Sequence, residues 1–241
     1  MKFERNFTVG VKDVGRGNRI TNYAFLSFLE EIASYHSNLC GYGVNDVETK
    51  GKAWILMDWK LRVFKRPKYA EVINIKTWAR PIEKHVFYTY RDFEVFCGDK
   101  LVAIATSKWV LLDVTSKKIT KITDEIFSEY SSEDTKVFEE EEIPKLKESK
   151  EKSLNLIYEV KRADIDMINH MHNLNYLSLA YETIPEESYF GKEKSNVHIM
   201  YKHQILLGEK VKCYYVKQDE KEIITLKSED DKILHAIIEL S

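Results

Sequence analysis

The sequence predicts an α+β fold in which one unit, a long helix packed on an antiparallel sheet, occurs twice. Three observations support this prediction. Two segments, 13–31 and 164–182, align without a gap. In each of them an amphipathic helix pattern follows a short polar loop. Stretches rich in β-branched and aromatic residues, separated by turn residues, then follow each helix.

The internal repeat is the most specific of these signals. The segments "DVGRGNRITNYAFLSFLEE" (13–31) and "DIDMINHMHNLNYLSLAYE" (164–182) are identical at six of nineteen positions, with an offset of 164 − 13 = 151. A second match places "GDKLVAIA" (98–105) over "DDKILHAI" (230–237), with an offset of 230 − 98 = 132. Two matches in the same order indicate a duplication.

The helix of each copy is predicted from its apolar spacing. In the first copy Phe25, Phe28, Leu29 and Ile32 follow the i, i+3, i+4, i+7 pattern, and in the second the stripe is Leu174, Leu177, Tyr181 and Ile184. Asn is a preferred N-cap, so the shared Asn22 and Asn173 are predicted to cap these helices. Gly41 and Gly43 are predicted to end the first helix and Pro185 the second.

Strands are predicted after each helix. The stretches of the first copy are 54–64, 71–80, 85–96 and 101–113, and those of the second are 197–206, 210–217, 222–228 and 233–240. A helix followed by four antiparallel strands buries its apolar stripe on their sheet, which is the outline of a hotdog fold. We predict an N-terminal hotdog over 1–130 and a C-terminal hotdog over 153–241.

The segment 131–152 between the copies is highly charged and poor in apolar residues, which predicts a solvated linker. An exposed helix with charge pairs four residues apart is the alternative. Over the whole chain, 37 basic and 39 acidic residues nearly cancel, which argues against a nucleic-acid partner. No apolar run approaches the ~20 residues of a membrane helix, and the charged N-terminus lacks the apolar core of a signal peptide.

The three cysteines, Cys40, Cys97 and Cys213, lie far apart without a Cys-x-x-Cys pair. This pattern favours reduced thiols in a cytoplasmic protein over disulfides or a zinc site. "HMH" with a nearby Asp also suggests a metal site, but no further ligands follow at a suitable spacing, so we predict neither metal nor cofactor. Cys213, within an apolar strand pattern, is predicted to be a small core residue.

The duplication provides an internal control for function. Where the first copy has Gly15, Arg19 and Thr21, the second has Asp166, His170 and His172. Proton-handling groups therefore occur in only one copy, although the surrounding scaffold residues are shared. An unperturbed His titrates near neutral pH and is a natural general base. Any chemistry is accordingly predicted for the second copy.

The segment "DIDMINHMHN" ahead of a helix resembles the active-site segment of the acyl-acyl carrier protein thioesterases, a family that pairs two hotdog units in one chain. The resemblance extends over most of the sequence. It includes "SKWVLLDVTSKKITKITDEI" (107–126), "NRITNYAFL" (18–26) and "RPKYAEVINIKTWAR" (66–80). It implies hydrolysis of fatty acyl-acyl carrier protein thioesters, with acyl carrier protein as partner.

The resemblance also implies site residues. Asp166 matches the family's Asp and His170 its His, while Ile168 stands in place of an Asn that the neighbouring Asn169 could replace. His172 stands where many members have Asn, and Asn173 matches the next Asn. Gln204 and Ile205 occupy the positions of a catalytic Glu and, in plant members, a Cys. Water attack is therefore predicted in place of a Cys nucleophile.

In this scheme His170 is the base, Asp166 orients it or binds the water, and Gln204 holds the water. Free N–H groups at the helix start after Asn173 form the oxyanion site. The resemblance further implies that the first hotdog holds the acyl chain, with His172, Phe25, Trp54 and Trp59 as substrate contacts. The same aromatic residues are most simply the core of that unit. His198 and His203, on the later strand, are lesser candidates for lining the site.

Three questions stay open at this point. A hotdog hydratase or dehydratase would also keep a His and an acidic group, and a binding protein without activity would fit the replacements at Ile168 and Gln204. The basic stretch "KLRVFKRPK" (60–68) is either a solvated hairpin or part of a face for an acidic carrier protein. Two hotdogs in one chain remove the usual reason for a homodimer without forbidding one.

Overall fold

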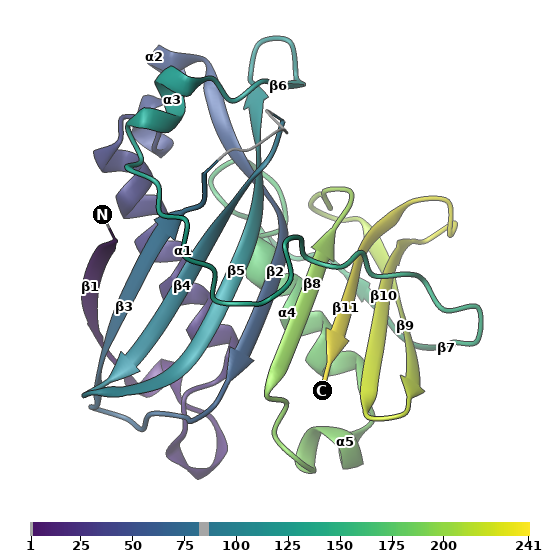
Figure 1. The fold of residues 1–241 in the computed structure, drawn as a ribbon. Helices are drawn as coiled ribbons and strands as arrows, with labels where there is room; N and C mark the ends of the chain where they lie inside the picture. The colour runs from purple at the N-terminus through teal and green to yellow at the C-terminus, as the bar shows by residue number, and fades with distance from the viewer. Residues whose placement is uncertain (1, 82–86) are drawn as a thin grey trace. The chain divides into compact units, whose positions relative to one another are not determined.

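The computed structural model describes residues 2–81 and 87–241 and divides the chain into two compact units, Met1–Ile143 and Pro144–Ser241. Each unit has its longest helix beside an antiparallel sheet (Figure 1). The predicted α+β double hotdog is therefore confirmed.

Unit 1 contains a sheet with the strand order β1-β3-β4-β5-β2, and β6 pairs with β5. Its strands are β1 (Phe3–Thr8), β2 (Lys52–Val63), β3 (Val72–Ala79), β4 (Thr89–Cys97), β5 (Lys100–Asp113) and β6 (Lys118–Thr120). Its helices are α1 (Asn22–Leu39), α2 (Val47–Lys50) and α3 (Asp124–Ser128). Helix α1 packs against β1 and β3.

Unit 2 repeats this arrangement in a shorter form, with the strand order β7-β9-β10-β11-β8. Its strands are β7 (Ser153–Glu159), β8 (Asn196–Tyr201), β9 (Lys210–Gln218), β10 (Lys221–Ser228) and β11 (Leu234–Leu240). Its helices are α4 (Asn173–Thr183) and α5 (Glu186–Phe190). Helix α4 packs against β7, β9 and β11. The first strand of each unit thus pairs with the third.

The duplication extends to the hydrogen-bond register. Arg5 lies opposite Ile75 in unit 1, and Leu156 lies opposite Cys213 in unit 2. These pairs give offsets of 156 − 5 = 151 for the first strands and 213 − 75 = 138 for the third strands. The same 138 relates β2 to β8, because the N–H groups of Phe64 and Lys202 donate to equivalent carbonyls at 2.8 Å in both units.

Those carbonyls correct the second sequence match. They belong to Val102 and His235, which gives an offset of 235 − 102 = 133 and not the predicted 132. The offsets differ because the turn before β11 is longer than the turn before β5. Cys97 pairs with Lys100 across a two-residue turn, whereas β10 ends at Ser228 and β11 begins at Leu234. A one-residue slip matters because it exchanges the two faces of a strand.

The predicted stripe is confirmed for α1, and for two of its four residues in α4, because Tyr181 is only half-buried and Ile184 is the C-cap beyond the end of the helix. Phe25, Leu29 and Ile32 are fully buried, and Phe28 is half-buried with its ring centroid 5.1 Å from that of Phe7. In α4, Leu174 and Leu177 are buried. The first helix ends at Leu39, followed by the left-handed Gly41 at φ +70°. A Cβ at Gly43 would lie 2.6 Å from the Cα of Asn38, so only glycine fits there.

The predicted caps are wrong by one residue. The N-caps are Thr21 and His172, and Asn22 and Asn173 are the first residues inside their helices. Thr21 Oγ1 accepts the N–H of Ala24 at 3.1 Å. Thr21 and His172 have non-helical φ/ψ angles, and their side chains accept N–H groups of the first helical turn. The path of the backbone therefore decides which residue is the cap, although Asn has the higher cap propensity.

Several strand predictions also need correction. Strands β1 and β7 precede the loops and were not predicted. The predicted strand 85–96 begins at Thr89, and residues 85 and 86 lie outside the described part of the chain. The predicted strand 197–206 ends at Tyr201, because three consecutive exposed residues (202–204) interrupt the alternation of buried and exposed side chains.

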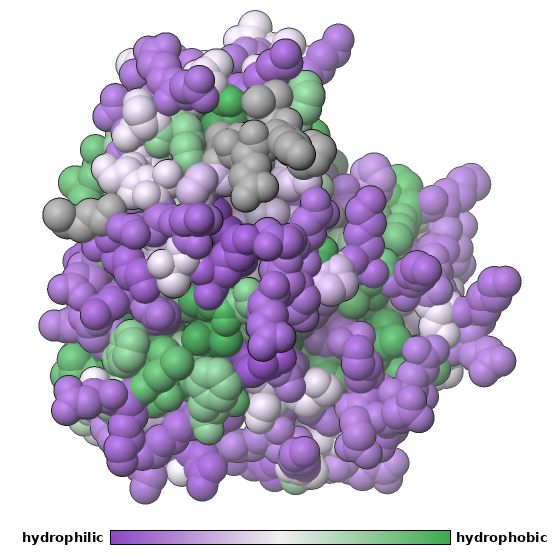
Figure 2. All heavy atoms as spheres, viewed as in Figure 1, coloured by the Kyte–Doolittle hydropathy of each residue, from purple (hydrophilic) through white to green (hydrophobic). Residues whose placement is uncertain are grey.

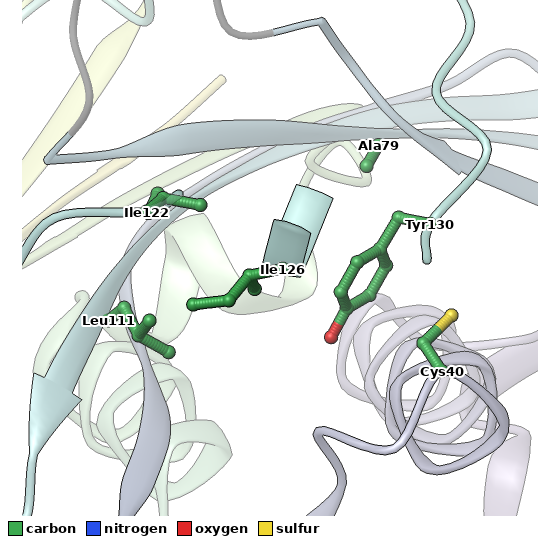
Figure 3. Close-up of a cluster of buried hydrophobic side chains, with 6 residues drawn as sticks. All are labelled: Cys40, Ala79, Leu111, Ile122, Ile126 and Tyr130. Carbon is green, nitrogen blue, oxygen red and sulfur yellow. The ribbon is translucent and has the colours of Figure 1, made fainter. Parts of the chain in front are cut away.

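The end of the unit 1 core is closed by α3 and the residues after it. One cluster of buried side chains joins Cys40, Ala79, Leu111, Ile122, Ile126 and Tyr130. In Figure 3 the Tyr130 ring lies between Ile126 and Cys40. Tyr130 also accepts a 2.7 Å hydrogen bond from Trp54 Nε1, so this cluster fixes one of the aromatic residues predicted to contact substrate.

The segment 131–152 contains no helix or strand where the chain is described, which contradicts the exposed-helix alternative. It is not merely solvated, since Phe138 and Ile143 are buried and Thr135 accepts a 2.7 Å hydrogen bond from Trp78 Nε1. The hotdog boundaries at 130 and 153 stay predictions. On the face shown in Figure 2, hydrophilic residues predominate and apolar areas lie between them. No helix among the described residues is long and apolar enough to cross a membrane.

Candidate active site

The polar segment ahead of α4 is anchored by Asp164. Its Oδ2 accepts the N–H of Lys161 at 2.7 Å and the hydroxyl of Tyr158 at 2.8 Å. Its carbonyl accepts the N–H of His172 at 2.8 Å and Nδ2 of Asn175 at 3.1 Å. All of these bonds are made within the loop and its flanks. Asp164 therefore acts as a structural anchor for the loop.

Between these anchors the chain forms a tight hairpin. Ile165 and Met171 form an antiparallel bridge, and the N–H of Asp166 donates to the carbonyl of His170 at 2.8 Å. Asn169 closes the turn with a φ of +63°, a conformation that Asn tolerates better than most residues. The hairpin therefore presents the side chains of Asp166 and His170 from neighbouring positions on a fixed backbone.

The Asp166 carboxylate stabilises this backbone directly. Its Oδ1 accepts the N–H of Ile168 at 2.9 Å and the N–H of His170 at 3.1 Å. A hydrogen bond between the carboxylate and the His170 ring is not among those of the described residues. Asp166 thus contacts His170 through the main chain. The His170 ring is partly buried.

His172 and Asn173 have structural contacts of their own. Nδ1 of His172 accepts the N–H of Leu174 at 3.3 Å, so in the neutral ring the proton is on Nε2. The carbonyl of Asn173 accepts the Tyr201 hydroxyl at 3.0 Å. The N–H of Asn175 donates to the His172 carbonyl at 2.9 Å. Two N–H groups predicted for the oxyanion site are therefore already bonded to His172.

Gln204 lies on an irregular segment after β8, and not on a strand as predicted. Its side chain is exposed. The next residue, Ile205, is fully buried and its carbonyl accepts the N–H of Met171 at 2.8 Å. Because Met171 follows His170, this bond places the Gln204 segment beside the hairpin. Of the predicted catalytic residues, Asp166, Asn169 and His170 lie in the hairpin, with the Gln204 segment bonded next to it, and Asn173 is the first residue of α4.

The neighbourhood of Gln204 contains a residue that sequence reasoning missed. His235, on β11, is buried, and its Nδ1 lies 3.2 Å from the carbonyl oxygen of His203 and 3.1 Å from that of Gln204. Burial lowers its pKa below the usual value. The signal was present in the sequence: with the repeat at an offset of 133, His235 is another imidazole found only in the second copy. His198, a lesser candidate from the sequence, is also buried and lies within β8.

The predicted substrate contacts in unit 1 are core residues. Phe25 and Trp59 are fully buried, and the Trp59 ring lies 5.3 Å from that of Phe93. Trp59 Nε1 has no hydrogen-bond partner among the described residues. Trp54 is half-buried and bonded to Tyr130, as described above. These positions suit a wall of a pocket within the first unit, and equally its packed core.

The other candidate groups carry no site. Cys213 is fully buried, and burial raises the pKa of its thiol to about 12, so it is a core residue as predicted and a poor nucleophile. No cluster of three or more His, Cys, Asp or Glu side chains suited to a metal occurs among the described residues. The described arrangement around His170 is an imidazole on a hydrogen-bonded hairpin, with the Gln204 segment adjoining it.

The chain has two hotdog units of the same topology, which places it in the class of double-hotdog proteins. One of the units has an Asp-His hairpin ahead of its helix. The family is shown by the two halves separately. Residues 1–130 match the acyl-ACP thioesterase N-terminal domain, and residues 147–238 match the acyl-ACP thioesterase C-terminal domain. The chain belongs to the acyl-ACP thioesterase family.

Plant relatives support this assignment. The chain is 24% identical over 222 residues to a chloroplastic oleoyl-acyl carrier protein thioesterase of Coriandrum sativum, covering 85% of this chain and 59% of the relative. It is 24% identical over 241 residues to oleoyl-acyl carrier protein thioesterase 2 of Arabidopsis thaliana, covering 92% and 65%. The chain thus spans about three fifths of the length of these relatives.

Solved structures share the fold over the full chain. An acyl-ACP thioesterase from Bacteroides thetaiotaomicron superposes with a TM-score of 0.87 at 16% identity, covering 99% of this chain and 96% of that one. The 12:0-ACP thioesterase from Umbellularia californica gives a TM-score of 0.86 at 17% identity, covering 100% and 96%. At these identities the likeness concerns the fold.

Proposed function

We propose that this protein hydrolyses fatty acyl thioesters of acyl carrier protein to a free fatty acid and the carrier thiol. The observation that carries the proposal is the Asp166–His170 hairpin. Unit 2 has it directly ahead of α4, whereas the equivalent hairpin of unit 1 has Gly15 and Arg19 in these positions. Family membership and the names of the plant relatives support the substrate class.

In the proposed reaction His170 removes a proton from water while the water oxygen attacks the thioester carbonyl carbon. The carbon–sulfur bond then breaks, sulfur leaves with the electron pair, and the proton passes to sulfur. Gln204 holds the water through its amide, which can donate and accept hydrogen bonds without taking a proton. Asp166 keeps the hairpin rigid, and Asn169 and Asn173 contribute polar groups next to the reacting centre.

We further propose that unit 1 holds the acyl chain, with Phe25, Trp54 and Trp59 as apolar walls, and that His172 lies beside the thioester. The buried aromatic residues of unit 1 support this division. A cytoplasmic location is proposed because all three cysteines are free thiols. A homodimer stays an option, which the molar mass in solution decides.

The experiment is a measurement of thiol release from acyl carrier protein thioesters of different chain lengths. We expect the wild type to release thiol, and the His170→Ala variant to be slower by about a hundredfold or more, the usual size of a general-base contribution. Arg19→Ala, at the equivalent position of unit 1, is the matched control and keeps the wild-type rate. Thioester binding without thiol release would identify a binding protein, and water addition or loss would identify a hydratase or dehydratase.

A further inference from the structure

The segment that carries Gln204 is held by a single residue of β11. The carbonyl of His235 accepts the N–H of Lys202 at 2.8 Å and the N–H of His203 at 3.2 Å. Its Nδ1 lies 3.2 Å and 3.1 Å from the carbonyl oxygens of His203 and Gln204. Because carbonyl oxygens only accept hydrogen bonds, this nitrogen carries the proton and donates to both. Main chain and side chain of His235 thus clamp the same segment.

Unit 1 has the main-chain half of this clamp without the side-chain half. The carbonyl of Val102 accepts the N–H groups of Phe64 and Lys65 at 2.8 Å and 3.1 Å. Val102 stands at the position of His235, with 235 − 102 = 133. The backbone arrangement therefore forms with an apolar side chain at this position. The imidazole of His235 is an addition found in the unit that has the candidate active site.

His235 is suited to donate a hydrogen bond and poorly suited to exchange a proton. It is 3% exposed, and burial lowers its pKa despite the opposing effects of the two carbonyls and of Glu209. His203 is the other titratable group that acts on it, and it lowers the pKa further. The ring is thus neutral near neutral pH, with one N–H. The Tyr176 hydroxyl adds a 3.4 Å bond to the His203 carbonyl.

The residue held by the clamp, Gln204, is directly followed by the residue that is bonded to the His170 hairpin. Gln204 receives the bond from His235, and the next carbonyl, that of Ile205, receives the N–H of Met171 at 2.8 Å. Met171 directly follows His170. A shift of the segment 203–205 would therefore move both the Gln204 side chain and the end of the hairpin.

We propose that His235 is a positioning residue of the hydrolytic site, whose Nδ1–H fixes the Gln204 segment relative to the His170 hairpin. The proposal rests on the proposed function for its kinetic consequence. A displacement of reacting groups by about 1 Å can lower a rate a hundredfold. Loss of the clamp would move the Gln204 segment relative to His170, so we expect it to affect kcat more than substrate binding. An ordinary core histidine would affect stability instead.

The test compares His235→Val with His235→Asn in the full-length protein. Val reproduces the residue of unit 1 and removes the donor, whereas the Asn amide can donate to the same carbonyls. We expect His235→Val to lower kcat about tenfold or more, with KM within about twofold and the melting temperature within about 3 °C of wild type. We expect His235→Asn to recover kcat to within about threefold, with the pH profile of the wild type.

Amide hydrogen exchange of the substrate-free protein provides the second measurement. In His235→Val the N–H of Met171 is expected to exchange at least tenfold faster than in wild type and in His235→Asn. A Val variant with wild-type kcat and unchanged Met171 exchange overturns the proposal, and so does an Asn variant as slow as the Val variant. If the wild type hydrolyses no thioester, the proposed function fails, and the exchange rates alone decide whether His235 positions the segment.

Discussion

The loops ahead of α1 and α4 have the same hydrogen bonds at almost the same distances. Each begins with a shared Asp, Asp13 in unit 1 and Asp164 in unit 2. The carboxylate accepts the N–H three residues earlier at 2.8 Å and 2.7 Å, respectively. The carbonyl accepts the N–H eight residues later at 3.0 Å and 2.8 Å. The frame of the loop is therefore independent of which unit it belongs to.

The hairpins within the loops share their closing backbone hydrogen bonds, although Gly17 is left-handed at φ +68° and the equivalent Ile168 is not. The N–H groups of Gly15 and Asp166 both donate to the carbonyl four residues later at 2.8 Å, and their carbonyls accept the N–H three residues later at 3.2 Å and 3.1 Å. Asn18 and Asn169 close the turns with φ of +56° and +63°. Among the side chains that differ, those at three positions gain a proton-handling group, changing from Gly15, Arg19 and Thr21 to Asp166, His170 and His172.

The candidate active site is therefore a set of side chains on a backbone whose closing hydrogen bonds also form without them. Residues that both loops share, such as the Asp anchors, explain the shape of the loop. Residues found in one loop are the candidates for chemistry. Exchanging or removing these side chains tests which of them the reaction needs.

The largest effect is expected from replacing the three side chains of unit 2 by those of unit 1, as Asp166→Gly, His170→Arg and His172→Thr. The loop should fold, because the same backbone bonds form in unit 1 with these residues. Thioester hydrolysis should fall at least a hundredfold, because the base is lost. Thiol release and circular dichroism measure the two outcomes. A folded variant with more than a tenth of the wild-type rate would contradict the assignment.

The second-largest effect is expected for the stability of unit 1 in acid, because α1 contains the buried His36. This buried imidazole accepts a 2.9 Å hydrogen bond from Arg91 Nη1, and burial together with the Arg91 charge lowers its pKa to about 3. Between pH 6.5 and 3 the unfolded chain binds a proton that the folded chain does not. Stability therefore falls as the pH decreases through this range, by about 2 kcal/mol at pH 5.

The matched variant for this effect is His36→Asn, which keeps an acceptor for Arg91 and cannot be protonated. Urea unfolding at pH 7 and pH 5 measures the free energy of unfolding for both proteins. The decrease should be smaller in the variant, with a remainder from His235, whose pKa is also lowered by burial. An equal decrease in wild type and variant would exclude His36 as the source.

A smaller effect is expected for Asp166→Gly alone, which makes the hairpin of unit 2 resemble that of unit 1. The two N–H groups of Ile168 and His170 lose their acceptor and turn to water, which costs about 1 to 2 kcal/mol of stability. Chemical denaturation measures the change. Gly15→Ala in unit 1 serves as the comparison, where the added Cβ meets Thr21 Cγ2 at 3.1 Å. A neutral Asp166→Gly would show that the carboxylate does not stabilise the hairpin.

The smallest effect concerns the helix caps. Thr21→Ala removes an oxygen cap from α1 and should cost about 1 kcal/mol. His172→Thr replaces the 3.3 Å imidazole cap of α4 by the residue type that caps α1, and should stabilise the protein by a few tenths of a kcal/mol. Thermal unfolding at one fixed pH resolves both. A destabilising His172→Thr would mean that the imidazole makes a further contact that matters.

The helix stripes, most strands and the duplication could be predicted from the sequence, because apolar periodicity reports directly on burial. The caps could not, since Asn is the better cap by propensity and the fold places Thr21 and His172 at that position instead. The edge strand β7 was missed because it is largely exposed and its apolar residues, such as Leu154 and Ile157, do not alternate cleanly. The edge strand β1 alternates, but four of its six residues are polar or charged.

The Asp166–His170 pair of the site was visible in the sequence, because the two copies could be compared residue by residue. His235 was not, because the matching letters "DK" lie in turns of different length and set the alignment one residue off. A single-residue slip placed Leu234 opposite Val102 and concealed a histidine. Turn length is determined by the local path of the backbone, which side-chain periodicity does not report.

The pairing of the first strand with the third, described for both sheets, determines an order of events during synthesis. Arg5 pairs with Ile75 at a sequence separation of 75 − 5 = 70 residues, and Leu156 pairs with Cys213 at a separation of 213 − 156 = 57. Such distant pairing is slow to form, since the loop must close before the contacts stabilise it. Unit 1 contains all of its strands and is complete before those of unit 2 emerge from the ribosome. The bond between Met171 and Ile205 joins residues that are both made after every strand of unit 1, so the candidate active hairpin can form only after the strands of unit 1 have been made.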